Sequence, residues 1–207
     1  MHEIGTPDYA LIKSEIQNKD SQWYYPVLME RAMSLDTNLT MHDFHFLYYG
    51  YIFSDYYMYV DPLTYKDEVM LYLKTKDITS NEYQAVLVLL NKARREFPFD
   101  KGKVELIINL YRKLNNNEKA DMLSKQMEAV IKVMLLSGDG KTKETAIHVI
   151  SVPHEYSLIN ILGYTKKKQY LLENKYDVIE GLDSKGNHAN IYFNIEQLML
   201  KTQSIFK

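Results

Sequence analysis

The sequence predicts an α+β protein in which a long helical part precedes a small antiparallel sheet. Apolar residues recur at helical spacing through the first two thirds of the 207-residue chain. After Asp139 the apolar period changes to two, which is typical of strands. Hydrophobic residues make up 46% of the chain, enough for a substantial core. We therefore expect a helical part over residues 1–136 and an α+β part over residues 137–207, packed together as one unit.

Three short helices are expected within residues 6–61. Pro7 stands at a first-turn position after Thr6, and Pro26 opens a second helix that runs to Leu35. Thr40 begins the third helix and is followed three residues later by Asp43, the spacing of a capping box.

Two helical hairpins are expected next, over about residues 63–97 and 101–136. Tetratricopeptide repeats are helix pairs of about 34 residues with small residues where the helices touch. Tyr111 and Ala120 fall on the tyrosine and alanine positions of such a repeat, and Ala93 and Pro98 fall on matching positions of the unit before it. The tryptophan and glycine of the repeat are missing. The hairpins are therefore similar to tetratricopeptide repeats but degenerate.

Short strands and helices are expected to alternate in the last part of the chain. Gly138 is predicted to end the preceding helix in a left-handed conformation. Pro153 opens a helix that Gly163 ends, and Asn194 caps a terminal helix. Strands are predicted over residues 144–152, 168–173, 176–182 and 190–193.

A near-miss of a phosphate-binding loop lies between the two parts, at Gly140-Lys141-Thr142. Such a loop needs a further glycine at the position of Leu135, and it leaves a strand to open a helix. Here a helical pattern leads in and a strand pattern follows, so the order is reversed. The stretch is better explained as a helix end before a strand.

Charge and composition narrow the classes of ligand. The net charge is −2, and Lys and Arg are spread along the chain, so the basic stripe of a nucleic-acid-binding protein is missing. No apolar run approaches the roughly 18 residues of a membrane span. The chain has no cysteine, which excludes thiolate ligands and a cysteine nucleophile. We expect a soluble protein with no cofactor, no nucleic-acid partner and no membrane span.

The candidate catalytic residues are His154, Glu155, Lys141 and Asp139. A helix starting at Pro153 places His154 and Glu155 at its N-terminus, where the dipole favours carboxylates and disfavours a protonated histidine. Together with His148, the pair suits a general base or an anion-facing site. The alternative is that Glu155 is simply a favourable first-turn acid and His154 a surface residue.

A polar lip is expected around the start of the strand that follows Asp139. We expect it to meet the His154 turn in a cleft at the junction of the two parts, where ligands often bind. The alternative is a structural corner whose side chains satisfy free backbone groups. The lip consists of Asp139, Lys141, Thr142, Glu144 and Thr145.

Tyrosine is unusually frequent, with 18 residues against 7 Phe and 1 Trp. Tyr49, Tyr57 and Tyr59 fall off the apolar stripe of the helices, so they are candidates for a surface that stacks on sugars or on a partner's peptide. Core packing explains Tyr48 and Tyr51 equally well.

His42 and His45 lie three residues apart on the third predicted helix, a spacing that can bring two imidazoles to one metal ion. The sequence offers no third ligand beside them. We therefore expect a surface pair and no metal site.

Four motifs together resemble one protein family. They are Trp23-Tyr24-Tyr25-Pro26-x-Leu28-Met29, Asp36-Thr37-x-Leu39-Thr40, Leu47-Tyr48-Tyr49-Gly50-Tyr51 and Ser137-Gly138-Asp139-Gly140-Lys141-Thr142-x-Glu144-Thr145-Ala146. The combination is similar to the domain-of-unknown-function family number 4919 over nearly the whole chain.

The resemblance implies bacteroidetal proteins of about this length, often exported, and supplies no catalytic residues. Residues 1–5 have neither the basic nor the apolar region of a signal peptide. Export is therefore expected only if the gene encodes a signal upstream of this chain.

Two functions are consistent with these features. The first is a binding or scaffold protein that holds a protein or peptide partner on the helical hairpins and the Tyr-rich helices. The alternative is a small hydrolase or transferase with a polar site at the 139–155 junction. Binding is preferred, because the spacing identifies no nucleophile with an adjacent base.

Overall fold

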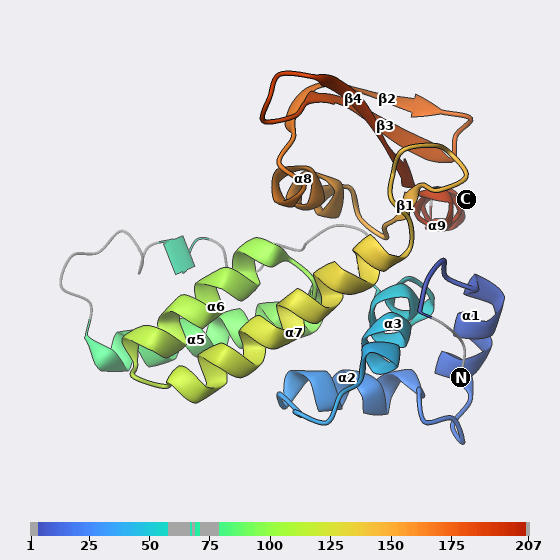
Figure 1. The fold of residues 1–207 in the computed structure, drawn as a ribbon. Helices are drawn as coiled ribbons and strands as arrows, with labels where there is room; N and C mark the ends of the chain where they lie inside the picture. Colours follow the sequence, from blue (N-terminus) through green and yellow to red (C-terminus); the bar gives the residue numbers. More distant parts are fainter. Residues whose placement is uncertain (1–3, 58–66, 68, 71–78, 206–207) are drawn as a thin grey trace.

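The computed structural model describes residues 4–57, 67, 69–70 and 79–205. Figure 1 shows an α+β arrangement in which helices form the larger part and a four-stranded sheet lies beyond the C-terminal end of a long central helix, α7. The predicted fold class is confirmed. Among the described residues, no helix combines the length and apolar character needed to cross a bilayer.

The first helices begin at local capping signals. α1 (Tyr9–Gln17) is capped by Asp8, whose side chain accepts a hydrogen bond from Leu11 N at 3.0 Å. α2 (Tyr25–Met33) has a proline in its first turn, and α3 (Met41–Gly50) begins with the predicted Thr40–Asp43 capping box. A short 3₁₀ turn, η1 (Tyr51–Phe53), follows α3.

Three longer helices follow, α5 (Ser80–Glu96), α6 (Lys101–Lys113) and α7 (Asn117–Leu136), and they lie side by side in Figure 1. The α6–α7 pair matches the hairpin predicted over residues 101–136. The first helix of the hairpin predicted over residues 63–97 falls largely outside the described residues. The likeness to tetratricopeptide repeats stays a prediction.

The sheet has the strand order β1-β4-β3-β2. β2 (Thr165–Leu172), β3 (Tyr176–Leu182) and β4 (His188–Asn194) pair antiparallel, close to the predicted strands. The strand predicted over residues 144–152 was wrong in length and pairing, because β1 covers only Ile147–His148 and runs parallel to β4. The sheet is therefore mixed rather than purely antiparallel.

The shortening of β1 has a local cause. Thr142 and Thr145 bond to each other in a turn, and α8 (Val152–Ile161) already begins at Val152. Gly163 ends α8 with φ of +77°, as predicted. The sheet is followed by α9 (Glu196–Ile205), with Asn194 Oδ1 accepting from Glu196 N at 3.0 Å.

Gly138 does not have the predicted left-handed conformation. A Cβ at this position would lie 2.3 Å from the carbonyl oxygen of Thr145 and 2.4 Å from that of Ala146. Gly138 is therefore required by a close approach of two backbone segments, which brings the end of α7 against the segment leading into β1.

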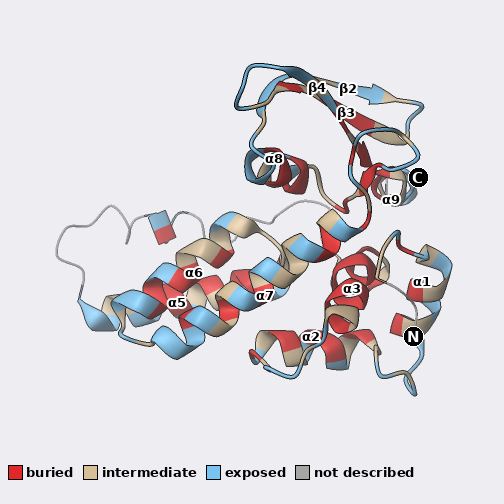
Figure 2. Cartoon of the chain, in the orientation of Figure 1, coloured by how far each residue is buried: buried red, intermediate tan, exposed pale blue. Residues whose placement is uncertain are grey.

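Two apolar cores share α7. The larger core joins α1, α2 and α3 to the C-terminal part of α7 and to the sheet, and includes Val133 of α7. The smaller core lies among α5, α6 and the N-terminal part of α7, and includes Leu123. Figure 2 shows buried residues on the facing sides of α5, α6 and α7, and along most of α3. α3 is buried nearly all round because it packs against α1, α2 and α7.

Candidate functional site

Asp139 and Lys141 bond within their own loop. Asp139 Oδ1 accepts hydrogen bonds from Thr145 Oγ1 at 2.6 Å and from Lys141 N at 3.0 Å, and Oδ2 lies 3.1 Å from Lys141 Nζ. The Thr145 hydroxyl, followed by the Lys141 backbone amide, lowers the pKa of Asp139 to about 2. Asp139 is thus an ionised carboxylate that caps a surface turn.

The remaining polar groups of the predicted lip also serve the turn. Thr142 N donates to Thr145 Oγ1 and Thr145 N donates to Thr142 Oγ1, both at 3.3 Å. Gly140 N donates to the carbonyl oxygen of Thr145 at 2.8 Å, so it does not point towards a phosphate. Hydrogen bonds to its own backbone N–H and to Thr142 lower the pKa of Glu144. These contacts match the structural-corner alternative.

His154 is buried rather than on the surface, with 5% of its area exposed. Its Nδ1 lies 2.8 Å from Tyr48 Oη on α3, and its Nε2 lies 3.1 Å from the carbonyl oxygen of Phe99. A carbonyl can only accept, so Nε2 carries the proton and Nδ1 accepts from the Tyr48 hydroxyl. Burial lowers the pKa of His154 to about 4. The ring is a neutral link among α3, α8 and the α5–α6 turn.

Glu155 enters a different environment, between α8 and the sheet. It is fully buried, and its Oε2 accepts from Gln169 Nε2 of β2 at 3.2 Å while Oε1 has no partner. Gln169 Nε2 also donates to Asp177 Oδ2 of β3 at 2.5 Å. Burial, followed by the nearby Asp177 carboxylate, raises the pKa of Glu155 to about 9. Glu155 therefore keeps its proton at neutral pH.

The buried acid cluster, defined as Glu155, Gln169 and Asp177, has a polar outer edge. Gln169 Oε1 accepts from Tyr156 Oη at 2.7 Å and from Lys166 Nζ, and Lys166 Nζ lies 4.3 Å from the centre of the Tyr156 ring. Sequence reasoning missed Gln169 and Asp177. Asp177 carried the only available signal, as an acid directly before the apolar pair Val178 and Ile179 of β3, although Glu180 in the same strand gives a similar signal.

The four candidate catalytic residues are thus divided among three places. His154 bonds towards α3, and Glu155, the next residue, bonds towards the sheet. Asp139 and Lys141 bond to each other on the surface. None of the hydrogen bonds or ion pairs among the described residues links these three places.

His148 and Tyr49 belong to the packing between α1, α3 and β1. His148 Nδ1 lies 3.2 Å from Tyr9 Oη, and Tyr49 Oη donates to the carbonyl oxygen of His148 at 3.2 Å. Burial lowers the pKa of His148 to about 4. Tyr49 was predicted to face outward, but it is fully buried because α3 is enclosed by neighbouring elements.

Two other predicted tyrosines have different outcomes. Tyr57 is half-buried, and its ring packs against that of Tyr51 in a tilted arrangement with ring centres 5.3 Å apart. Tyr59 lies outside the described residues.

His45 was expected to form a surface pair with His42. It is instead buried, with its ring packed against that of Tyr49. The described part of the chain contains no group of three or more residues placed to hold a metal ion.

A surface hollow of about 530 Å³ lies at the junction of the two parts; we call it the junction hollow. This is where a cleft was expected, but neither Asp139 nor Lys141 lines it. Apolar and aromatic groups dominate the lining, and a few polar groups join them. The lining comprises Tyr51, Tyr57, Phe97, Phe99, Asp100, Lys101, Gly102, Ile150, Ser151, Val152, Pro153, His154, Ser157 and Leu198.

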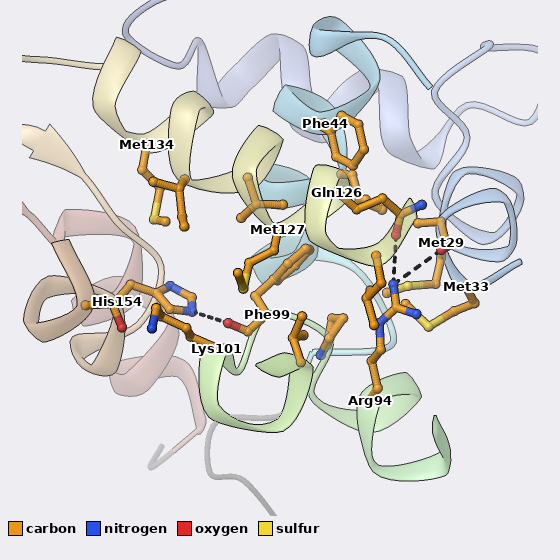
Figure 3. Close-up of a pocket in the computed structure, with 18 residues that line it drawn as sticks. Met29, Met33, Phe44, Arg94, Phe99, Lys101, Gln126, Met127, Met134 and His154 are labelled. Carbon is orange, nitrogen blue, oxygen red and sulfur yellow. Dashed lines mark hydrogen bonds between the residues drawn. The ribbon is translucent and has the colours of Figure 1, made fainter. Parts of the chain in front are cut away.

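A smaller cavity of about 50 Å³, the methionine cavity, lies beside the junction hollow. Figure 3 shows His154 and Lys101 at one end and Arg94 and Gln126 at the other. Met127 and Phe99 lie between the two ends. Four residues line both spaces, namely Phe99, Lys101, His154 and Ser157.

Comparison with known proteins gives one result. No curated protein and no solved structure matches the chain. The family described as "Domain of unknown function (DUF4919)" matches residues 10–204, nearly the whole chain. The resemblance noted from the four motifs is thereby confirmed, and the chain belongs to the DUF4919 family.

Proposed function

We propose that this protein is a binding protein that holds a segment of a peptide or protein partner in the junction hollow. The observation that carries the proposal is the hollow itself, whose volume of about 530 Å³ lies within the range of ligand sites. Tyr57, Phe97 and Phe99 line it. Such rings offer a large contact area with little loss of side-chain entropy.

The polar groups of the hollow suit recognition of one apolar side chain with adjacent backbone. Asp100 already caps α6 by accepting from Lys103 N at 2.9 Å, and Lys101 pairs with Glu105 on the same helix. Asp100 can accept hydrogen bonds from backbone N–H groups and Lys101 can donate to backbone carbonyl groups, so the two residues together favour a peptide ligand. We therefore propose a partner segment with a large apolar residue that enters the hollow.

A hydrolase or transferase has less support. Both ring nitrogens of His154 have partners, so it is not free to act as a base. Ser157 Oγ donates to the carbonyl oxygen of Pro153 at 3.1 Å, rather than to a base. Nucleophilic catalysis needs an accessible hydroxyl bonded to a base, and Ser157 has no such base. His154 accepts from the Tyr48 hydroxyl, but Tyr48 is fully buried and its Oη also accepts from Ile150 N at 3.3 Å.

A peptide display library selected on the immobilised protein tests the proposal. We expect enriched sequences that share a large apolar residue. Their affinity, measured by fluorescence anisotropy, should fall about tenfold or more when Ser157→Trp fills the hollow. Failure to enrich any sequence, or equal affinity for the filled variant, would overturn the proposal.

Ser124→Trp provides a matched control. Ser124 Oγ donates to the carbonyl oxygen one turn earlier, at 2.8 Å, just as Ser157 Oγ does. It is likewise half-buried on a helix but does not line the hollow. Its replacement should leave peptide affinity within about twofold of the original, because the binding surface is untouched.

A further inference from the structure

Arg94 of α5 is a buried cation without an acidic partner. Only 5% of its surface is exposed. Its Nη2 donates to Gln126 Oε1 at 2.9 Å and to the carbonyl oxygen of Ala32 at 3.3 Å, and both acceptors are neutral. Among the described residues no carboxylate pairs with it. Burial lowers the pKa of Arg94 to about 10, so the guanidinium remains charged at neutral pH.

Two buried donors beside this charge have no partner. They are Arg94 Nε and the amide Nε2 of Gln126. Both residues line the methionine cavity. A buried charge and unsatisfied donors are costly unless an acceptor meets them, and a carboxylate is the acceptor that best matches a guanidinium.

The rest of the cavity selects what accompanies the anion. Between the Arg94 end and the His154 end lie Phe99 and Met127, and Met134 lies on the His154 side (Figure 3). Methionine side chains are flexible and polarisable, and adapt to irregular apolar ligands. One water needs roughly 10–15 Å³ of such space, so about 50 Å³ holds a ligand of about three to five non-hydrogen atoms.

We propose that the methionine cavity binds a small monocarboxylate with a short apolar tail, whose carboxylate is held by Arg94 and Gln126. The tail lies along the methionine side chains towards His154. The two residues proposed to hold the carboxylate, Arg94 and Gln126, do not line the junction hollow, so either proposal can fail without the other.

Methyl NMR of the full chain, with ¹³C-methyl-labelled methionine, tests this site using propionate as the probe. The chain has ten methionines. We expect saturable shifts of the cavity methyls of Met29, Met33, Met127 and Met134, with binding at roughly millimolar concentration for so small a ligand. Met70 and Met199 do not line the cavity, and their methyls serve as internal controls.

Propionamide is the matched neutral ligand, because it has the same size without the charge. It should bind about tenfold or more weakly than propionate if the carboxylate is recognised. Equal shifts with both ligands, or no saturable shift with propionate up to about 100 mM, would overturn the proposal. Shifts of the control methyls alone would also overturn it, since they indicate non-specific contact.

Two variants separate recognition from folding. Arg94→Leu removes the cation and should abolish the propionate shifts. Gln126→Glu places a carboxylate against Arg94 from within the chain, so it should abolish propionate binding in a folded protein even if Arg94→Leu does not fold. Propionate binding by Gln126→Glu at the original affinity would contradict the proposed site.

Discussion

Replacement of Glu155 by Gln should remove a pH-dependent loss of stability. The folded protein keeps the Glu155 proton up to a pKa of about 9, while the unfolded chain loses it near 4.5. Stability from this group is therefore complete below pH 4.5 and falls as the pH rises towards 9. A Gln side chain has nearly the same size and shape as the protonated Glu side chain and has no proton to lose.

The size of the effect follows from the interval between the two pKa values. Between these two pKa values, each rise of one pH unit lowers the unfolding free energy of the original protein by about 1.4 kcal/mol relative to that of Glu155→Gln. The difference in unfolding free energy between the two proteins should grow by about 3 kcal/mol from pH 5.5 to 7.5. This change in unfolding free energy is not reduced for solvent screening, because Glu155 has no exposed surface.

Urea unfolding followed by circular dichroism, at several pH values for both proteins, measures this difference. His148 and His154 have lowered pKa values and give the opposite trend, with stability rising between about pH 4 and 6.5. Their contribution is the same in both proteins and cancels. Glu128→Gln, an exposed change on α7, is the control and should show no growing difference. A constant difference between the original protein and Glu155→Gln would refute a protonated Glu155.

Two further substitutions test the packing of the junction. Gly138→Ala forces a Cβ to within 2.3 Å of a backbone oxygen and should cost about 2 kcal/mol or more in chemical denaturation, whereas Gly102→Ala, with its nearest contact at 3.3 Å, should be nearly neutral. If Gly138→Ala lowered the unfolding free energy only slightly, the end of α7 and the segment leading into β1 would not be held closely together. Tyr48→Phe leaves His154 Nδ1 without its donor and should cost about 2 kcal/mol, while the exposed Tyr170→Phe should change stability by less than about 0.5 kcal/mol. Equal losses for the two tyrosines would remove the proposed role of the His154 contact.

The features that the sequence predicted correctly are local ones. The Thr40–Asp43 capping box and the end of α8 at Gly163 depend on residues within one or two helical turns. β3 covers the predicted 176–182 because apolar residues and flanking turns both mark it. β1 was misjudged in length and pairing, because alternation continued through a turn, and β2 and β4 begin two or three residues before their predicted starts.

The candidate site could not be predicted in the same way, because burial depends on distant segments. His154 bonds to Tyr48, 106 positions away, and Glu155 of α8 lies near Asp177, which belongs to the sheet. Arg94 has the same local setting as Arg95, yet Arg94 is buried and Arg95 pairs with Glu30 at the surface. Their different environments come from the way α5 packs on its neighbours.

The shared helix α7 links the methionine cavity mechanically to the sheet. It is a continuous helix of 20 residues, about 30 Å long, and contains neither glycine nor proline that would favour a hinge. Gln126 lies beside the cavity near its middle, and Met134 lies in the larger core close to its end. Because α7 also contacts β1, residues that line the cavity and residues that support the start of the sheet belong to one rigid element.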